Sequence, residues 1–261
     1  MKLKVVSFVG ALALVLVAAS SRVMTVTNGQ PDGNGHPFVG TVIQPIPSMP
    51  GFVSVCSGSA LSDSRFLTAA HCADPSAGLV FVSYGSTING SSVFTPGVFT
   101  PDPQWCEGCG SGLQGFDSHD VAVVSLLSPA PIATGYAQLP SAGQVDTLAM
   151  MSPVDIVGYG VQGFLRGHGK PEQVFLFTRF FAPSQLVQSN NLASDQFIKM
   201  TANPSKGTGG VCFGDSGGPD LIGGTHTVIA VNSFVSNTNC SGVTYSQRVD
   251  LPDILAFIRG I

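Results

Sequence analysis

Short apolar runs, each ended by glycine or proline, recur along most of the chain. Four of them have the length and composition of buried strands: residues 52–55, 79–82, 121–124 and 154–157. The pattern continues over 173–181 and 228–235. The 32 glycines and 18 prolines supply frequent chain reversals and interrupt each run before a helical period can develop. The sequence therefore predicts an all-β fold.

One helix is predicted, at the C-terminus. Asp250 is the candidate N-cap, and Pro252 suits the first helical turn. Four apolar side chains then fall on one helical face: Ile254, Leu255, Phe257 and Ile258. We expect this helix to pack on the core without a chemical role.

The N-terminus has the features of an export signal. Lys2 and Lys4 precede an apolar run over 5–19, and small residues at 17–20 suit a signal peptidase. We predict a signal peptide over 1–20, a candidate propeptide over 21–25, and a secreted, extracellular protein without stable membrane association after cleavage. An uncleaved N-terminal anchor is the alternative, although the run is short for a bilayer span.

Charge and cysteine content narrow the class of protein further. Only 10% of the residues are charged and the net charge is -4, so we expect no nucleic-acid partner. The six cysteines, an even number, are typical of compartments where disulfides form. Six cysteines allow 15 pairings, so their spacing alone does not fix the connectivity.

The strongest chemical signal is the segment 212–219, in which Ser216 lies between glycines. The absence of neighbouring side chains lets a substrate backbone approach the serine. Flanking glycines also allow a bend that points successive N–H groups at one spot, where they can hold the oxyanion of a tetrahedral intermediate. A glycine-rich turn without a chemical role is the alternative.

A serine hydroxyl needs a base, usually a histidine that a carboxylate orients. His71 ends an apolar run beside a cysteine, and a disulfide there would fix its backbone. Asp120 directly precedes the run 121–124, so the strand entrance would shield it, whereas its competitor Asp117 lies in a loop. Three other histidines are expected to be solvated loop residues: His36, His168 and His226.

Three motifs in this order resemble those of the chymotrypsin-like (trypsin-fold) serine protease family. Thr-Ala-Ala-His-Cys at 68–72 resembles the family's histidine motif, and His-Asp-Val-Ala-Val at 119–123 resembles its aspartate motif. Gly-Asp-Ser-Gly-Gly-Pro at 214–219 matches its serine motif. The order His, Asp, Ser is that of chymotrypsin. The resemblance covers roughly residues 26–261.

The resemblance implies two six-stranded antiparallel β-barrels with a short C-terminal helix. The first barrel would occupy 26–135, and the second barrel with the helix 136–261. It implies a serine endopeptidase that cleaves polypeptides through an acyl-enzyme, needs no cofactor or metal, and has proteinaceous inhibitors as candidate partners. The catalytic triad would be His71, Asp120 and Ser216, between the two barrels.

The resemblance also assigns the rest of the site. The N–H groups of Gly214 and Ser216 would form the oxyanion hole, and Ser233 would support the Asp120 carboxylate. The specificity pocket would be formed by Gly210 at its base, Val211 beside it, and walls from Phe213, Phe234 and Val235. Without an acid at the base, a preference for Lys or Arg is not expected. Val235 replaces a glycine of the family and narrows the pocket, so small or medium apolar side chains are expected.

Two further expectations follow from the resemblance. A new N-terminal ammonium would pair with Asp215, and the segment 26–29 resembles the family's N-terminal motif, with the bond after Arg22 as an alternative cleavage site. The family's pairing implies the disulfides Cys56–Cys72 and Cys212–Cys240. That leaves Cys106 and Cys109, for which a small-loop disulfide is favoured over half a zinc site or a redox pair.

Two rival functions fit parts of the sequence. The segment 214–218 fits the Gly-x-Ser-x-Gly pattern of α/β-hydrolase esterases, but that fold needs an acid and a histidine after the serine and helices between the strands. Only His226 follows Ser216, and helical alternation is missing. The more serious rival is a catalytically silent binding protein of the same fold, although all three triad residues are present.

Overall fold

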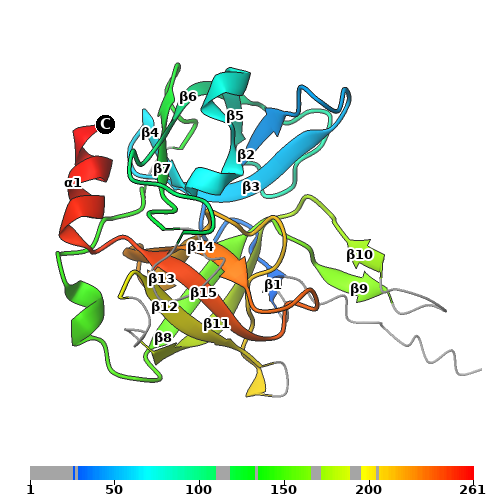
Figure 1. The fold of residues 1–261 in the computed structure, drawn as a ribbon. Helices are drawn as coiled ribbons and strands as arrows, with labels where there is room; N and C mark the ends of the chain where they lie inside the picture. Colours follow the sequence, from blue (N-terminus) through cyan, green and yellow to red (C-terminus); the bar gives the residue numbers. More distant parts are fainter. Residues whose placement is uncertain are drawn as a thin grey trace, which may run out of the picture.

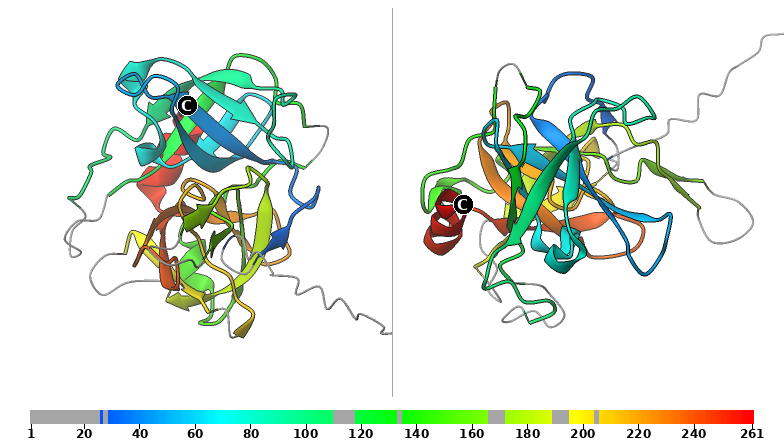
Figure 2. Two further views of the ribbon diagram at one scale, coloured as in Figure 1. Left: turned by 90° about the vertical axis from the view of Figure 1, so that its right-hand side faces the viewer. Right: turned by 90° about the horizontal axis from the view of Figure 1, so that it is seen from above.

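The computed structural model describes residues 26, 29–109, 118–132, 135–165, 172–188, 195–203 and 206–261. Within them the chain folds into two antiparallel β-barrels that lie one above the other (Figures 1 and 2). The predicted all-β fold with two six-stranded barrels is confirmed. The predicted export signal and the segment 21–25 lie outside the described residues. None of the helices in the described ranges has the length and apolar character needed to cross a membrane.

The first barrel is closed in the order β2-β3-β4-β7-β6-β5. Large apolar side chains such as Phe66, Leu67 and Val82 are fully buried in the cluster that contains its core. Its strands are β2 (Val39–Pro45), β3 (Val53–Ala60), β4 (Arg65–Thr68), β5 (Val80–Ser83), β6 (Thr95–Pro101) and β7 (Ala122–Leu126).

The second barrel follows the order β11-β12-β15-β14-β13-β8 and is closed by pairing of β8 with β11. A short strand near the start of the chain, β1 (Gln30–Pro31), joins this barrel along β11. A separate hairpin of β9 (Gly163–Leu165) and β10 (Glu172–Val174) projects from it (Figure 1). The barrel strands are β8 (Pro153–Gly158), β11 (Phe180–Gln188), β12 (Phe197–Ala202), β13 (Pro219–Ile222), β14 (Val228–Val235) and β15 (Gly242–Arg248).

The predicted C-terminal helix is present as α1 (Pro252–Gly260), with Ile254 and Ile258 buried in the cluster that contains the first barrel's core. The predicted N-cap is wrong, because Leu251 occupies that position. Asp250 has other partners: its carboxylate accepts hydrogen bonds from the Arg248 side chain, at 2.8 and 2.9 Å, and from the Val145 N–H, at 2.8 Å. A buried ion pair therefore prevails over the local capping preference.

Most predicted strands lie within a few residues of the observed ones, but the run predicted over 173–181 is interrupted. β10 ends at 174 and β11 begins at 180. Between them Phe177 has a φ of 51°, which breaks an extended conformation. Its carbonyl instead accepts a hydrogen bond from the Ile88 N–H of the first barrel, at 2.7 Å. Contacts between the barrels thus override the local strand preference here.

Candidate active site

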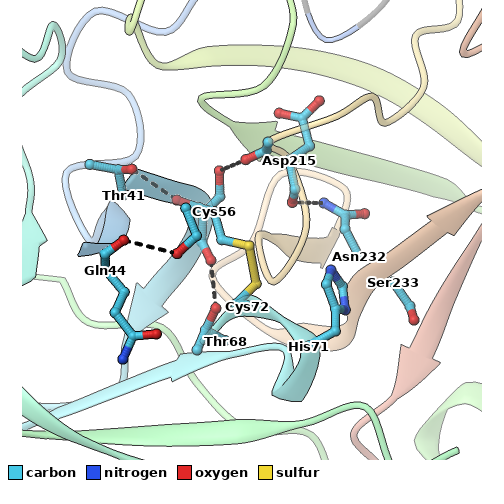
Figure 3. The surroundings of a disulfide bond; sticks show 12 residues. Thr41, Gln44, Cys56, Thr68, His71, Cys72, Asp215, Asn232 and Ser233 are labelled. Atoms are coloured by element: carbon cyan, nitrogen blue, oxygen red, sulfur yellow. Dashed lines mark hydrogen bonds between the residues drawn. A yellow bond between two sulfur atoms is a disulfide. The ribbon is translucent and has the colours of Figure 1, made fainter. Parts of the chain in front are cut away.

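His71 and Asp120 are in direct contact. His71 lies on a short 3-10 helix (Ala70–Cys72), and Asp120 lies two residues before β7. The His71 Nδ1 is 2.8 Å from the Asp120 Oδ2, and the His71 backbone N–H donates to Oδ1 at 3.0 Å. The Cys56–Cys72 disulfide joins the 3-10 helix to β3 beside the imidazole (Figure 3). The carboxylate therefore fixes both the backbone and the ring of the histidine.

The Asp120 carboxylate is completely buried, and further contacts hold it in place. The hydroxyl of Ser233, on β14, donates to Oδ2 at 2.5 Å. The Asp120 N–H donates to the side-chain oxygen of Gln247, on β15, at 3.3 Å. Burial acts to raise the pKa of Asp120, but the charge and hydrogen bonds of His71 and the Ser233 hydroxyl outweigh it, so the pKa lies below its ordinary value.

A cavity of about 280 Å³ opens beside His71 and Ser216. The His71 side chain is 28% exposed, so the imidazole is reachable from this cavity although its carboxylate partner is not. The structure thus brings the predicted histidine, aspartate and serine to one place. The cavity is lined by His71, Val211, Cys212, Phe213, Ser216, Asn232, Ser233, Phe234 and Val235.

The predicted pocket residues contribute unequally to this cavity. Gly210 is not among the lining residues: a Cβ at this position would lie 2.2 Å from the Cβ of Ala202, so Gly210 packs tightly against β12. Phe234 lines the wall and stacks on Tyr245, with ring centres 4.8 Å apart. Phe213 is 42% exposed at the rim. In the part of the chain that the structure describes, the lining includes no carboxylate or Lys/Arg side chain, so the described wall is mainly apolar.

The backbone around Ser216 forms a tight glycine-rich bend. Gly214 and Gly217 have φ angles of 94° and 76°, which place the segment in a tight bend. The neighbouring N–H groups of Asp215 and Gly217 are satisfied by backbone carbonyls. Over the ranges that the structure describes, the N–H groups of Gly214 and Ser216 have no protein acceptor. Both are thus available to an acceptor on a bound molecule.

Asp215 is a fully buried carboxylate without a cationic partner in the described part of the chain. Its oxygens accept hydrogen bonds from the N–H groups of Gly160, at 2.8 Å, and Cys212, at 2.9 Å. Burial dominates and raises its pKa to about 7. Within the predicted N-terminal motif, Val26 is buried and residues 27 and 28 lie outside the described residues.

The structure contains the three expected disulfides, Cys56–Cys72, Cys106–Cys109 and Cys212–Cys240. In the described ranges, one group of metal-ligating atoms lies close together: Cys56, His71 and Cys72. Both sulfurs are disulfide-bonded, so neither can bind a metal as a thiolate.

The histidines predicted to be solvated differ in their environments. His36 was expected in solvent, and that expectation is wrong: its Nδ1 lies 2.5 Å from the Asp32 Oδ1, and the ring stacks on Phe181. The same Asp32 carboxylate accepts a hydrogen bond from the buried Arg179 at 2.7 Å, so the partner of the His36 ring is itself held in place. His226 is exposed, as expected. His168 and Asp117 lie outside the described residues.

Three residues that contact the candidate site were not predicted from the sequence. Asn232 lines the cavity, and its side-chain amide donates to the Asp215 carbonyl at 3.2 Å (Figure 3). Gln247 contacts the Asp120 backbone from 127 residues away, so no local signal exists for it. The hydroxyl of Ser57, on β3 of the first barrel, donates a hydrogen bond to the Gly214 carbonyl at 2.9 Å. For Asn232 the sequence does offer a signal, because it is a polar residue next to Ser233 in a strand that is otherwise apolar.

Comparison with known proteins places the chain in a family. The family model described as Trypsin matches residues 31–255. No curated protein matches the chain. The solved structure of HL collagenase has a TM-score of 0.67 and 19% identity, covering 90% of this chain and 98% of that chain. The structure of GrC has a TM-score of 0.66 and 18% identity, covering 89% and 97%. The structural likeness shows the fold, and the match to the family model shows that this chain belongs to the trypsin family of chymotrypsin-fold proteins.

Proposed function

We propose that this chain is a secreted serine endopeptidase that hydrolyses peptide bonds through Ser216, His71 and Asp120. The observation that carries the proposal is the buried Asp120 carboxylate bonded to an imidazole that shares one cavity with Ser216. Membership of the trypsin family supports the same reaction. The three disulfides are consistent with an extracellular location.

In the proposed mechanism the Ser216 hydroxyl attacks the carbonyl carbon of the scissile peptide bond. His71 accepts the hydroxyl proton and later donates it to the departing amine. Asp120 binds the Nδ1 side of the ring, so the proton-accepting nitrogen is Nε2, and its negative charge stabilises the imidazolium that forms. Water then attacks the acyl-enzyme by the reverse route, with His71 again as base, and releases the acid product.

The N–H groups of Gly214 and Ser216 are the proposed oxyanion hole. Both lack a protein acceptor in the described ranges, and both belong to the glycine-rich bend around the nucleophile. Donors placed before reaction cost no reorganisation when the negative charge develops. Their freedom in this structure is the feature expected of donors reserved for a transition state.

The proposed specificity pocket accepts small or medium apolar side chains. Val211 and Val235 line the cavity together with aromatic rings, and among the described residues no acid faces it to pair with a Lys or Arg side chain. The branched Val235 limits the space available to a ring. Gly210 would act indirectly, by packing closely on Ala202 next to Val211, which lines the cavity.

Asp215 is the proposed partner of a newly cleaved N-terminal ammonium. A buried carboxylate without a cation is costly, and its raised pKa expresses that cost. An ammonium brought to this site by cleavage before Val26 would remove the cost and fix the bend that carries Gly214. We therefore propose that the exported chain is a zymogen.

Peptide hydrolysis tests the proposal directly. The processed chain is assayed on peptide p-nitroanilides with Ala, Val, Phe or Lys next to the cleaved bond, beside His71→Ala, Ser216→Ala and the exposed control His226→Ala. We expect cleavage after Ala and Val by the wild type and by His226→Ala, and at least 1000-fold slower cleavage by the other two variants, on the order seen when a triad residue is removed. A folded, processed wild type without hydrolysis would favour a silent binding protein.

A further inference from the structure

Ser57 lies on β3 of the first barrel, but it contacts the segment that carries the proposed nucleophile in the second. Its hydroxyl donates to the Gly214 carbonyl at 2.9 Å and accepts a hydrogen bond from the Tyr159 N–H at 2.9 Å. Its own N–H donates to the Ser216 carbonyl at 2.8 Å. Ser57 is completely buried. One small side chain therefore links β3, the end of β8 and the bend at Gly214.

The hydrogen bonds around Gly214 define the direction of its N–H group. On its N-terminal side, the Phe213 carbonyl accepts a hydrogen bond from the Val161 N–H at 2.7 Å. On its C-terminal side, the Gly214 carbonyl is held by the Ser57 hydroxyl. Glycine has wide conformational freedom, and the φ of 94° at Gly214 is one of several that it can adopt. Fixing both flanking peptide groups removes that freedom.

We propose that Ser57 is a positioning residue for the oxyanion hole. It holds the Gly214 N–H toward the cavity through the Gly214 carbonyl, without touching the substrate. This inference rests on the proposed function, because it assigns a role to Ser57 only if Gly214 donates to an oxyanion.

The Tyr159 contact extends this role. Tyr159 precedes Gly160, whose N–H donates to the buried Asp215 carboxylate. Without the Ser57 hydroxyl, the Tyr159 N–H loses its acceptor in a buried environment, where an unpaired donor is unfavourable. The same substitution thus loosens the bend at two points, Gly214 and the Gly160–Asp215 contact.

Ser59 offers a matched control on the same strand. It lies two residues from Ser57, so both side chains point to the same side of β3. Ser59 is equally buried, and its hydroxyl has no hydrogen-bond partner among the described residues. Ser57→Ala and Ser59→Ala therefore remove the same atom from the same strand, but only the first breaks a link to Gly214.

The test compares kcat, KM and affinity for a peptide aldehyde. The Ser216 oxygen adds to the aldehyde carbon, the Ser216 proton passes to His71, and the former carbonyl oxygen becomes the oxyanion in the hole. For Ser57→Ala we expect roughly tenfold lower kcat, KM within twofold of wild type, and roughly tenfold weaker aldehyde binding, the size of one lost hydrogen bond. Ser59→Ala should match the wild type in all three.

Two further readouts separate positioning from stability. Thermal unfolding of each variant shows whether the assays are made on folded protein, and Ser57→Thr, which retains a hydroxyl, should recover most of the lost kcat. Equal kcat and aldehyde affinity for Ser57→Ala and Ser59→Ala contradict the inference, as does a Ser57→Thr variant no faster than Ser57→Ala. If the wild type neither cleaves peptides nor binds the aldehyde, the proposed function fails and the inference falls with it.

Discussion

The Ser233 hydroxyl donates a 2.5 Å hydrogen bond to the Oδ2 of Asp120, the same oxygen that contacts the His71 ring. Ser233 belongs to the second barrel, whereas Asp120 and His71 belong to the first. The carboxylate is therefore held from both barrels. Any relative shift of the barrels would alter the orientation of the proposed base, so the barrel interface contributes to the geometry of the site.

Removal of this hydroxyl should slow the reaction without abolishing it. Hydrogen bonds to charged groups contribute roughly 1.5–3 kcal/mol, so we expect Ser233→Ala to lower kcat by about ten- to one hundredfold. Because Ser233 also lines the cavity, the assay uses substrates that differ only next to the cleaved bond. An equal loss of kcat for all of them indicates an effect through Asp120, whereas a loss confined to one substrate contradicts it.

The stability of the unprocessed chain should depend on the protonation of Asp215. Its pKa is about 7 in the folded chain, against an ordinary value of 3.8, so the folded chain holds more protons than the unfolded chain between about pH 4 and pH 7. The unfolding free energy should therefore fall as the pH rises through that window, and this contribution should level off above it.

The corresponding experiment uses Ser216→Ala chains to prevent self-cleavage. Urea unfolding between pH 4 and pH 8 is compared with and without the added substitution Asp215→Asn, which removes the titration. We expect the added substitution to flatten the decline of stability with pH. The nearby Asp220 is present in both proteins; burial raises its pKa and the charge of Asp215 raises it further, so the added substitution removes this coupling together with the Asp215 titration. Identical pH slopes would show that Asp215 does not titrate in this window.

The Cys106–Cys109 disulfide should be reduced before the other two. Cys109 is exposed and Cys106 half-buried, whereas the four other cysteines are at most 6% exposed. Limited treatment with a phosphine reductant, followed by alkylation and peptide mapping, should label Cys106 and Cys109 first. The melting temperature should change little, because this disulfide closes a short loop. Early labelling of Cys212 or Cys240 would contradict the burial of that pair.

Substitution of Val235 should widen the proposed specificity. Val235→Gly removes a branched side chain from the cavity wall, so a larger side chain gains room. We expect kcat/KM for a substrate with Phe next to the cleaved bond to rise about tenfold relative to one with Val, within the range that a few methylene groups produce. Unchanged relative rates would place the substrate side chain away from Val235.

The fold and the candidate site residues could be predicted from the sequence because both carry strong local signals. His71, Asp120 and Ser216 each lie in a short motif of unusual composition, and the apolar runs mark the barrel strands. The remainder depends on contacts between distant segments. Ser57 and Gly214 are 157 residues apart, so their hydrogen bond has no local trace. Asp250 is a good N-cap by composition, yet Arg248 and Val145 bind its carboxylate instead.

Covalent labelling of Ser216 tests the proposed triad most directly. A fluorophosphonate probe is incubated with the processed wild type and with Ser216→Ala, and the modified peptide is identified by mass spectrometry. The serine oxygen displaces fluoride from the probe phosphorus while the serine proton passes to His71, and this substitution is fast only where the hydroxyl is activated. We predict labelling at Ser216 of the wild type and none of the variant. A folded, correctly processed wild type that remains unlabelled, or labelling that persists in Ser216→Ala, would contradict the proposed triad.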